Sequence, residues 1–223
     1  MLDRKDTINN QSLGEEIANS ISHGAGALLA IAGTVIAIVY AAIYGDSLSV
    51  VSAALYGASL IILYASSTIY HALANNKAKR VFRVLDHCNI FVLILGTYIP
   101  ICLALLRGAL GWTYFGIIAA CAVVGIVLNA IDLKRWSKIS LVLYLIMGWM
   151  IIFATKQMIP LLPSESLAKS LWLLIGGGVA YSLGVIFFVL AKYKYMHYIW
   201  HLFVLAGSIL HYFFILFYVL PLR

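Results

Sequence analysis

Long, uninterrupted runs of apolar residues alternate with short polar segments along the whole chain of 223 residues. Each run holds about 20 residues, and an α-helix of that length, rising 1.5 Å per residue, crosses roughly 30 Å of hydrocarbon. We expect seven membrane-spanning helices, at about residues 21–44, 48–73, 86–106, 111–131, 139–158, 169–191 and 196–219. A transmembrane β-barrel is excluded, because its strands would alternate apolar and polar residues in segments of about ten.

The segments between these runs are short and contain residues that break helices. Examples are Gly45-Asp46-Ser47, Arg107-Gly108 and the pair Pro160 and Pro163. They leave no room for a second domain. The sequence therefore predicts a short cytoplasmic tail over residues 1–20, without a cleaved signal peptide, and a single seven-helix transmembrane domain over residues 21–223.

Composition supports the same class of protein. Hydrophobic residues make up 64% of the chain and charged residues 10%, whereas soluble domains average roughly 45–50% and about 25%. The excess of apolar side chains has to face lipid, so we predict an all-α integral membrane protein. The net charge of +7 does not indicate nucleic-acid binding, because the basic residues are scattered between apolar runs. The three cysteines form no CxxC pair, so neither a disulfide framework nor a thiolate zinc site is expected.

The basic residues predict the orientation of the chain. With seven spans the termini lie on opposite sides of the membrane, and most Lys and Arg fall on the side of the N-terminus. That side holds Arg4, Lys5, Lys77, Lys79, Arg80, Arg83, Lys134, Arg135, Lys138, Lys192 and Lys194, whereas the other side holds Arg107, Lys156, Lys169 and Arg223. The positive-inside rule therefore places the N-terminus in the cytoplasm and the C-terminus outside.

Few ionisable residues lie inside the predicted helices, and each is a candidate for function because its insertion into hydrocarbon costs a few kcal/mol. They are His23, His71, Asp86, His87, His197, His201 and His211. Asp46 and Asp132 lie in predicted loops and are interpreted as solvated charges.

His197 and His201 are four residues apart at the start of the last predicted helix. Four residues nearly complete a helical turn, so both imidazoles face the same side and can reach one metal ion at about 2.0–2.1 Å. The alternative is a pair of polar rings that form hydrogen bonds to other helices.

The predicted topology brings two further groups to the same depth in the membrane. His71 lies in the last turn of the second helix, and Asp86 is the first residue of the third, so both lie at the cytoplasmic end together with His197 and His201. Three histidines leave the fourth tetrahedral position open, which is typical of catalytic zinc. Asp86 then fits a role as hydrogen-bond or proton acceptor for a water on the zinc ion, with direct ligation as the alternative.

Ser67 precedes His71 by one helical turn and therefore faces the same side of its helix. Its hydroxyl is a candidate to bond the reacting oxygen or Asp86. The alternative is a bond to the carbonyl oxygen four residues earlier, which is common for serine in membrane helices.

The remaining histidines are weaker candidates. His211 lies about 15 Å along the helix from His201, too far to share an ion, and is interpreted as packing or bonding between helices. His87 is rotated about 100° from Asp86 and faces another helix or the interface. His23 lies near the cytoplasmic end of the first helix and could support the site. Cys88 points away from the face of Asp86 and is not expected to be a ligand.

Taken together, Ser67-x-x-x-His71, Asp86 and His197-x-x-x-His201 resemble the signature of the hemolysin III proteins and the progestin and adiponectin receptor family. The resemblance covers nearly the whole chain and includes the stretches Glu16–His23 and Thr97–Pro100. It implies seven helices, a cytoplasmic N-terminus, zinc held by His71, His197 and His201, an aspartate at Asp86 that contacts zinc through water, and the serine at Ser67. The short tails resemble the bacterial branch, which implies the bacterial inner membrane.

The leading hypothesis for function is a zinc-dependent hydrolase of a membrane lipid amide or ester. Relatives of the family include zinc-dependent amidases that act on ceramides, so the resemblance implies a ceramidase-like role in membrane lipid homeostasis. One alternative is a non-catalytic receptor or sensor whose helices are tied together by zinc. A pore-forming protein is the other, although a pore needs polar groups through the full depth of the membrane.

Overall fold

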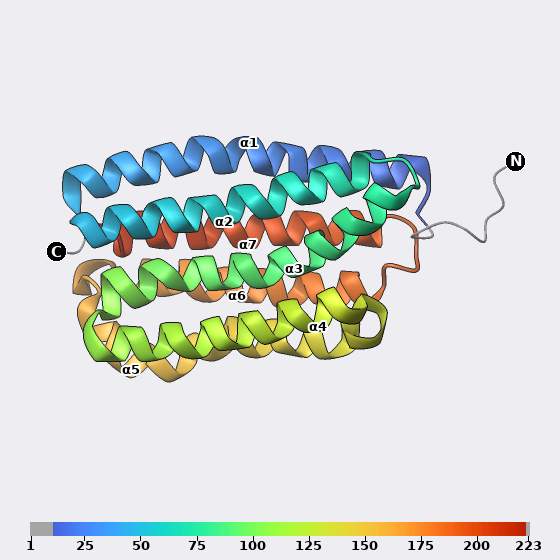
Figure 1. Ribbon diagram of the computed structural model, residues 1–223. Coiled ribbons are helices and arrows are strands. Elements are labelled where there is room, and N and C mark those ends of the chain that lie inside the picture. The colour runs from blue at the N-terminus through green and yellow to red at the C-terminus, as the bar shows by residue number, and fades with distance from the viewer. Residues whose placement is uncertain (1–10, 222–223) are drawn as a thin grey trace, which may run out of the picture.

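The computed structural model describes residues 11–221, which are helical almost throughout and contain no β-strand (Figure 1). The helices are α1 (Leu13–Tyr44), α2 (Ser47–Ala72), α3 (Lys77–Pro100), α4 (Gly108–Trp149), α5 (Thr155–Met158), α6 (Leu167–Val189) and α7 (Met196–Tyr218). A π-helical segment at Ile101–Leu106 extends α3, and 3₁₀ turns at Met150–Ala154, Ile159–Leu161 and Ser164–Ser166 surround α5. The all-α prediction is confirmed.

Within the described residues, six helical stretches are long and apolar enough to cross a membrane. They are Leu13–Tyr44, Ser47–Ala72, Lys77–Leu106, Gly108–Leu161, Ser164–Val189 and Met196–Tyr218. The chain is therefore an all-α membrane protein, but the count differs from the seven helices expected. The difference lies in Gly108–Leu161, whose 54 residues contain both 111–131 and 139–158.

The backbone of α4 leaves the helical conformation at Asp132, where φ is −157° and ψ is 92°. The Ser140 hydroxyl donates a hydrogen bond of 2.6 Å to Asn129 Oδ1, across 11 residues. In a continuous helix the Cα atoms of these two residues would lie about 16 Å apart. Figure 1 shows the chain turning back within α4, at the end of the bundle opposite α5. Helix α4 is therefore a hairpin of two arms, residues 108–131 and 133–149.

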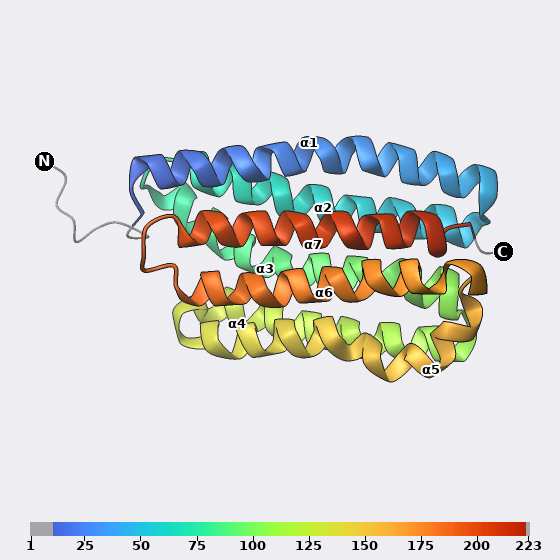
Figure 2. The same cartoon turned by 180° about the vertical axis from the view of Figure 1, so that it is seen from behind.

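The helices pack as an elongated bundle in which neighbours along the chain run in opposite directions (Figures 1 and 2). Helix α1 packs against α2 and α7, α3 packs between α2 and α4, and α6 packs against α7. Helix α2 therefore ends at the same end of the bundle where α1, α3 and α7 begin. We call this the histidine end, because it carries His71, His197 and His201.

Large apolar side chains cover the outside of the bundle. Leu28, Ile131 and Phe153 are each more than 70% exposed, whereas buried positions include Asn19, Ser67 and His201. This distribution is the opposite of that in a soluble protein and is stable only where hydrocarbon surrounds the bundle.

Two helices begin earlier than hydropathy indicates. Ser12 caps α1: its hydroxyl accepts from Glu15 N, while the Glu15 carboxylate accepts from Ser12 N, so residues 13–20 are helical rather than part of a tail. The Asn76 side chain caps α3 by accepting from Lys79 N, which places Asp86 in the third turn rather than at the first residue. Apolar runs mark only the part of a helix that contacts lipid, and these first turns carry charged residues.

Asp46 joins two turns at the opposite end of the bundle. Its Oδ1 caps α2 by accepting from Ser49 N at 2.9 Å, and its Oδ2 lies 2.7 Å from Arg107 Nη2, between α3 and α4. The bond from the Ser49 backbone, with help from Arg107, holds the pKa of Asp46 below its usual value.

Replacing Asp46 with alanine should lower the thermal unfolding midpoint in detergent by roughly 2–4 °C at pH 7, since loss of an N-cap costs about 1 kcal/mol. A lowered pKa stabilises the fold above the unfolded-state pKa, and this contribution is lost as the pH falls through the folded-state pKa. The gap between wild type and Asp46→Ala should therefore narrow below about pH 4. Asp46→Asn, which keeps an oxygen for the cap, should lie between them. Equal midpoints for all three proteins at pH 7 would contradict the assignment.

Candidate metal centre

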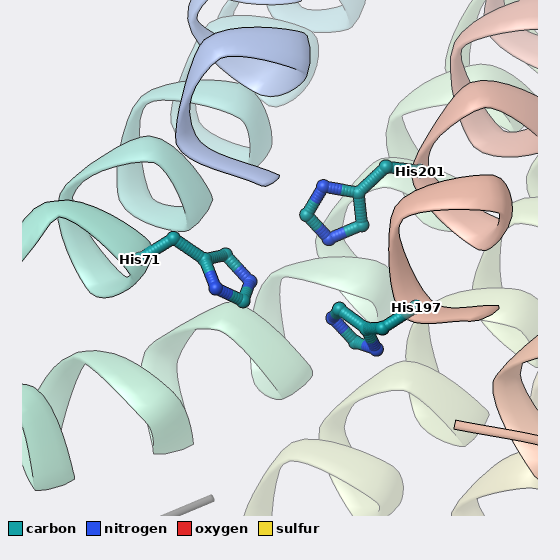
Figure 3. Close-up of side chains that lie close together, drawn as sticks. All are labelled: His71, His197 and His201. Atoms are coloured by element: carbon teal, nitrogen blue, oxygen red, sulfur yellow. The ribbon is translucent and has the colours of Figure 1, made fainter. Parts of the chain in front are cut away.

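Three histidines from two helices converge at the histidine end. His71 comes from the last turn of α2, and His197 and His201 come from the first turns of α7. One nitrogen from each ring lies within 4.8 Å of the others. Figure 3 shows the three rings facing one another across a common space. The structure therefore brings together the three residues that the sequence suggested as metal ligands.

Within residues 11–221, two ring nitrogens in this space have no hydrogen-bond partner although they are inaccessible to solvent: Nε2 of His71 and Nε2 of His197. A buried polar atom without a partner costs about 1–3 kcal/mol, so a native structure seldom tolerates several in one place. The lone pair of a neutral imidazole is a good ligand for zinc, which binds such nitrogens at about 2.0–2.1 Å. The residues present thus fit a metal ion.

Helix α1 contacts two of these rings at Nδ1, the nitrogen on the other side of the ring from Nε2. His71 Nδ1 lies 2.7 Å from Glu16 Oε2, and His201 Nδ1 lies 3.3 Å from the carbonyl oxygen of Asn19 and 3.3 Å from Ser22 Oγ. A carbonyl oxygen only accepts, so Nδ1 of His201 carries the proton and Nε2 keeps its lone pair.

Sequence reasoning did not assign Glu16 and Asn19 to this site because residues 1–20 were interpreted as a tail, and it did not consider Ser22 of the expected first helix. A signal was present: Ser12 and Glu15 are spaced as a capping box. A helix that begins at Leu13 places Glu16, Asn19 and His23 on one face, at positions i, i+3 and i+7.

Asp86 is 8% exposed and lines a cavity that also contacts His23 and His201. The cavity continues between α3, α4, α6 and α7 as far as His211, and most of its lining is aliphatic or aromatic. Asp86 Oδ2 lies 3.9 Å from His87 Nδ1, which donates instead to the carbonyl oxygen of Arg83 at 2.9 Å. The Asp86 carboxylate thus forms part of the cavity wall that also includes a histidine of the metal centre.

Ser67 is fully buried, and its hydroxyl has no hydrogen-bond partner in the described structure. The bond to a carbonyl oxygen of its own helix, which we considered as the alternative, is therefore absent. The neighbouring Ser66 does form such a bond, to the carbonyl oxygen of Leu63 at 3.0 Å.

Of the other histidines, His87 and His211 bond to backbone carbonyl oxygens, whereas His23 contacts the metal centre. His211 Nε2 donates to the carbonyl oxygen of Leu174 in α6 at 3.0 Å, which confirms a bond between helices. The His87 ring packs near Phe188 of α6, and the His23 ring stacks on His201 with centroids 3.6 Å apart. Cys88 is free and points toward the carbonyl oxygen of Ile126.

Comparison with known proteins shows relatives along nearly the whole chain. A family model described as haemolysin-III related matches residues 11–212. The protein named Hemolysin-3 of Bacillus cereus is 43% identical over 211 residues, which cover 95% of this chain and 94% of that protein. The protein named Hemolysin-3 homolog of Bacillus subtilis (strain 168) is 42% identical over 207 residues, or 93% and 95% of the two chains. The matched region includes every residue of the metal centre.

Metal analysis of the purified protein tests the centre. We expect about one zinc ion per chain in the wild type and a loss of most of it in His71→Ala, His197→Ala and His201→Ala, because two imidazoles alone hold zinc poorly. His211→Gln is the matched control, since it alters a half-buried histidine of the same helix about 15 Å from His201, and it should keep its zinc. Full zinc content in His197→Ala would contradict the centre.

Proposed function

The chain belongs to the haemolysin-III-related family, and on that premise we propose that it is a membrane-embedded zinc hydrolase that cleaves an amide or ester bond of a membrane lipid. One observation carries the proposal: the three histidines converge with unpartnered Nε2 atoms on His71 and His197, and the third, His201, lines a long cavity whose wall includes Asp86.

His71, His197 and His201 would hold the zinc ion, which leaves a fourth position open as in catalytic sites. Zinc there would supply Lewis acidity, which polarises a carbonyl group and makes water more acidic. Asp86 is the group in the cavity wall that can take a proton from the attacking water and return it to the leaving amine or alcohol. Ser67 has a buried hydroxyl free to orient Asp86 or the carbonyl oxygen of the substrate.

The shape and lining of the cavity favour a substrate with a hydrocarbon chain. The cavity contacts both His201 and His211, which are ten residues apart on α7, and so extends about 15 Å along the bundle. Leu93, Ile94, Val185 and Val204 are among the apolar residues of its wall. A lipid such as a ceramide could place its acyl chain there and its amide or ester near the histidines.

The topology that fits this role has seven crossings, with the two arms of α4 counted separately. The start of α3 and the turn at Asp132 carry lysines and arginines, the segment just before α7 carries Lys192 and Lys194, and all three lie at the histidine end. The positive-inside rule then places the metal centre at the cytoplasmic side of the bacterial inner membrane.

Single cysteines introduced into a cysteine-free variant test the topology. Ser137 and Ser164 are both exposed. Ser137 lies near the start of the second arm of α4, and Ser164 lies in the turns that follow that arm, at the opposite end of this stretch. A membrane-impermeant maleimide should label Ser164→Cys in intact spheroplasts and Ser137→Cys only after permeabilisation. Labelling of both cysteines from outside would contradict a membrane crossing by the second arm of α4. The reverse pattern would contradict the cytoplasmic location of the histidine end.

Lipid hydrolysis by the purified protein in nanodiscs tests the enzyme. Wild type should release fatty acid from at least one of a panel of ceramides and glycerolipids. Asp86→Asn should slow turnover by about 10²–10⁴-fold while zinc stays bound, because a proton acceptor is lost. Ser67→Ala should slow it by roughly tenfold, the effect of one hydrogen bond, and Asp132→Asn should leave it unchanged.

Stoichiometric zinc with no turnover of any lipid would overturn the hydrolase. If removal of zinc then also lowered the unfolding midpoint, the outcome would favour a zinc-stabilised receptor or sensor.

A further inference from the structure

Glu16 connects three helix ends beside the metal centre. Its side chain is 12% exposed; Oε2 lies 2.7 Å from His71 Nδ1, and Oε1 lies 2.9 Å from Lys79 Nζ. Lys79 is 4% exposed and also donates to the carbonyl oxygen of Leu73 at 3.0 Å, just beyond the end of α2. Glu16 of α1 is thus in contact with the last turn of α2 and the first turn of α3.

The contact with Glu16 determines which nitrogen of His71 has a lone pair available to bind a metal ion. A carboxylate only accepts, so the short bond requires a proton on Nδ1. The lone pair then belongs to Nε2, the buried atom without a partner in the space shared with His197 and His201. The bond to a charged acceptor also restricts rotation of the ring.

The neighbouring carboxylate, Glu15, accepts hydrogen bonds from other groups. Its Oε2 accepts from Ser12 in the capping box, and its Oε1 accepts from Tyr195 N at the start of α7 at 2.8 Å. No contact of Glu15 with a histidine is observed in the described structure. The two glutamates therefore form a natural pair for comparison, alike in sequence position and charge but different in what they touch.

We propose that Glu16 is the positioning residue of the metal centre: by accepting a hydrogen bond from His71 Nδ1, it fixes the tautomer and orientation through which His71 Nε2 binds the metal. This inference rests on the metal centre of the proposed function but not on hydrolysis. It assigns the contribution of α1 to metal affinity rather than to catalysis.

The test measures Zn²⁺ affinity of full-length protein in nanodiscs by competition with a chromophoric chelator, and the visible spectrum of the Co²⁺ form. Glu16→Ala should bind Zn²⁺ about 10–100-fold more weakly than wild type, which is typical when such a partner of a ligand is lost. The Co²⁺ spectrum should change in position or intensity. Glu16→Gln should lie between, because its amide oxygen still accepts but carries no charge.

Glu15→Gln is the matched control and should keep the Zn²⁺ affinity and Co²⁺ spectrum of wild type. Glu16→Ala also leaves Lys79 without its carboxylate, which can unfold the bundle. The double variant Glu16→Gln/Lys79→Met removes both charges and should show the weakened Zn²⁺ binding of Glu16→Gln with the helical content of wild type.

The outcomes separate the two proposals. Zn²⁺ affinity within about threefold of wild type in both Glu16→Ala and the double variant, while His71→Ala loses the metal, would overturn the role of Glu16 and leave the hydrolase standing. Weakened Zn²⁺ binding in a protein that hydrolyses no lipid would support Glu16 and overturn the hydrolase. Absence of Zn²⁺ binding by wild type would overturn both.

Discussion

Hydrocarbon offers no hydrogen-bond partner, so each polar side chain of this bundle has to find one on its own or a neighbouring helix. Most of them do. Tyr64 and Tyr181 share the hydroxyl of Ser208, and His211 bonds the backbone of Leu174. The same constraint makes the unpartnered Nε2 atoms of His71 and His197 informative, because one metal ion between them would satisfy both.

Four helices contribute side chains in and around the candidate metal centre. Helices α2 and α7 supply the three imidazoles, α3 supplies Asp86, and the first two turns of α1 contact His71 and His201 from behind. Helix α1 is the most lipid-exposed part of this group, yet its polar first turns lie against the site. A helix that appears peripheral by hydropathy therefore directly contacts two histidines of the candidate metal centre.

Two tyrosines connect α3 to the second arm of α4 beside the cavity. Tyr144 in the second arm of α4 donates to the carbonyl oxygen of His87, and Tyr98 of α3 donates to the carbonyl oxygen of Met147. Both tyrosines line the cavity and connect α3 to that arm. The hairpin at Asp132 thus places the second arm of α4 beside α3, where it forms part of the cavity wall.

The sequence alone determined the all-α membrane class and the approximate positions of α2, α6 and α7, because long apolar runs and their breaks carry that information directly. It also indicated His71, His197 and His201, since helical spacing and alternating direction place them at one end. The early starts of α1 and α3 depend on local caps at Ser12 and Asn76 that hydropathy does not report, whereas only the tertiary structure decided the contact of Glu16 with His71. The reason is physical: hydropathy reports where a helix meets lipid, whereas a bond between residues 55 positions apart depends on how separate helices pack.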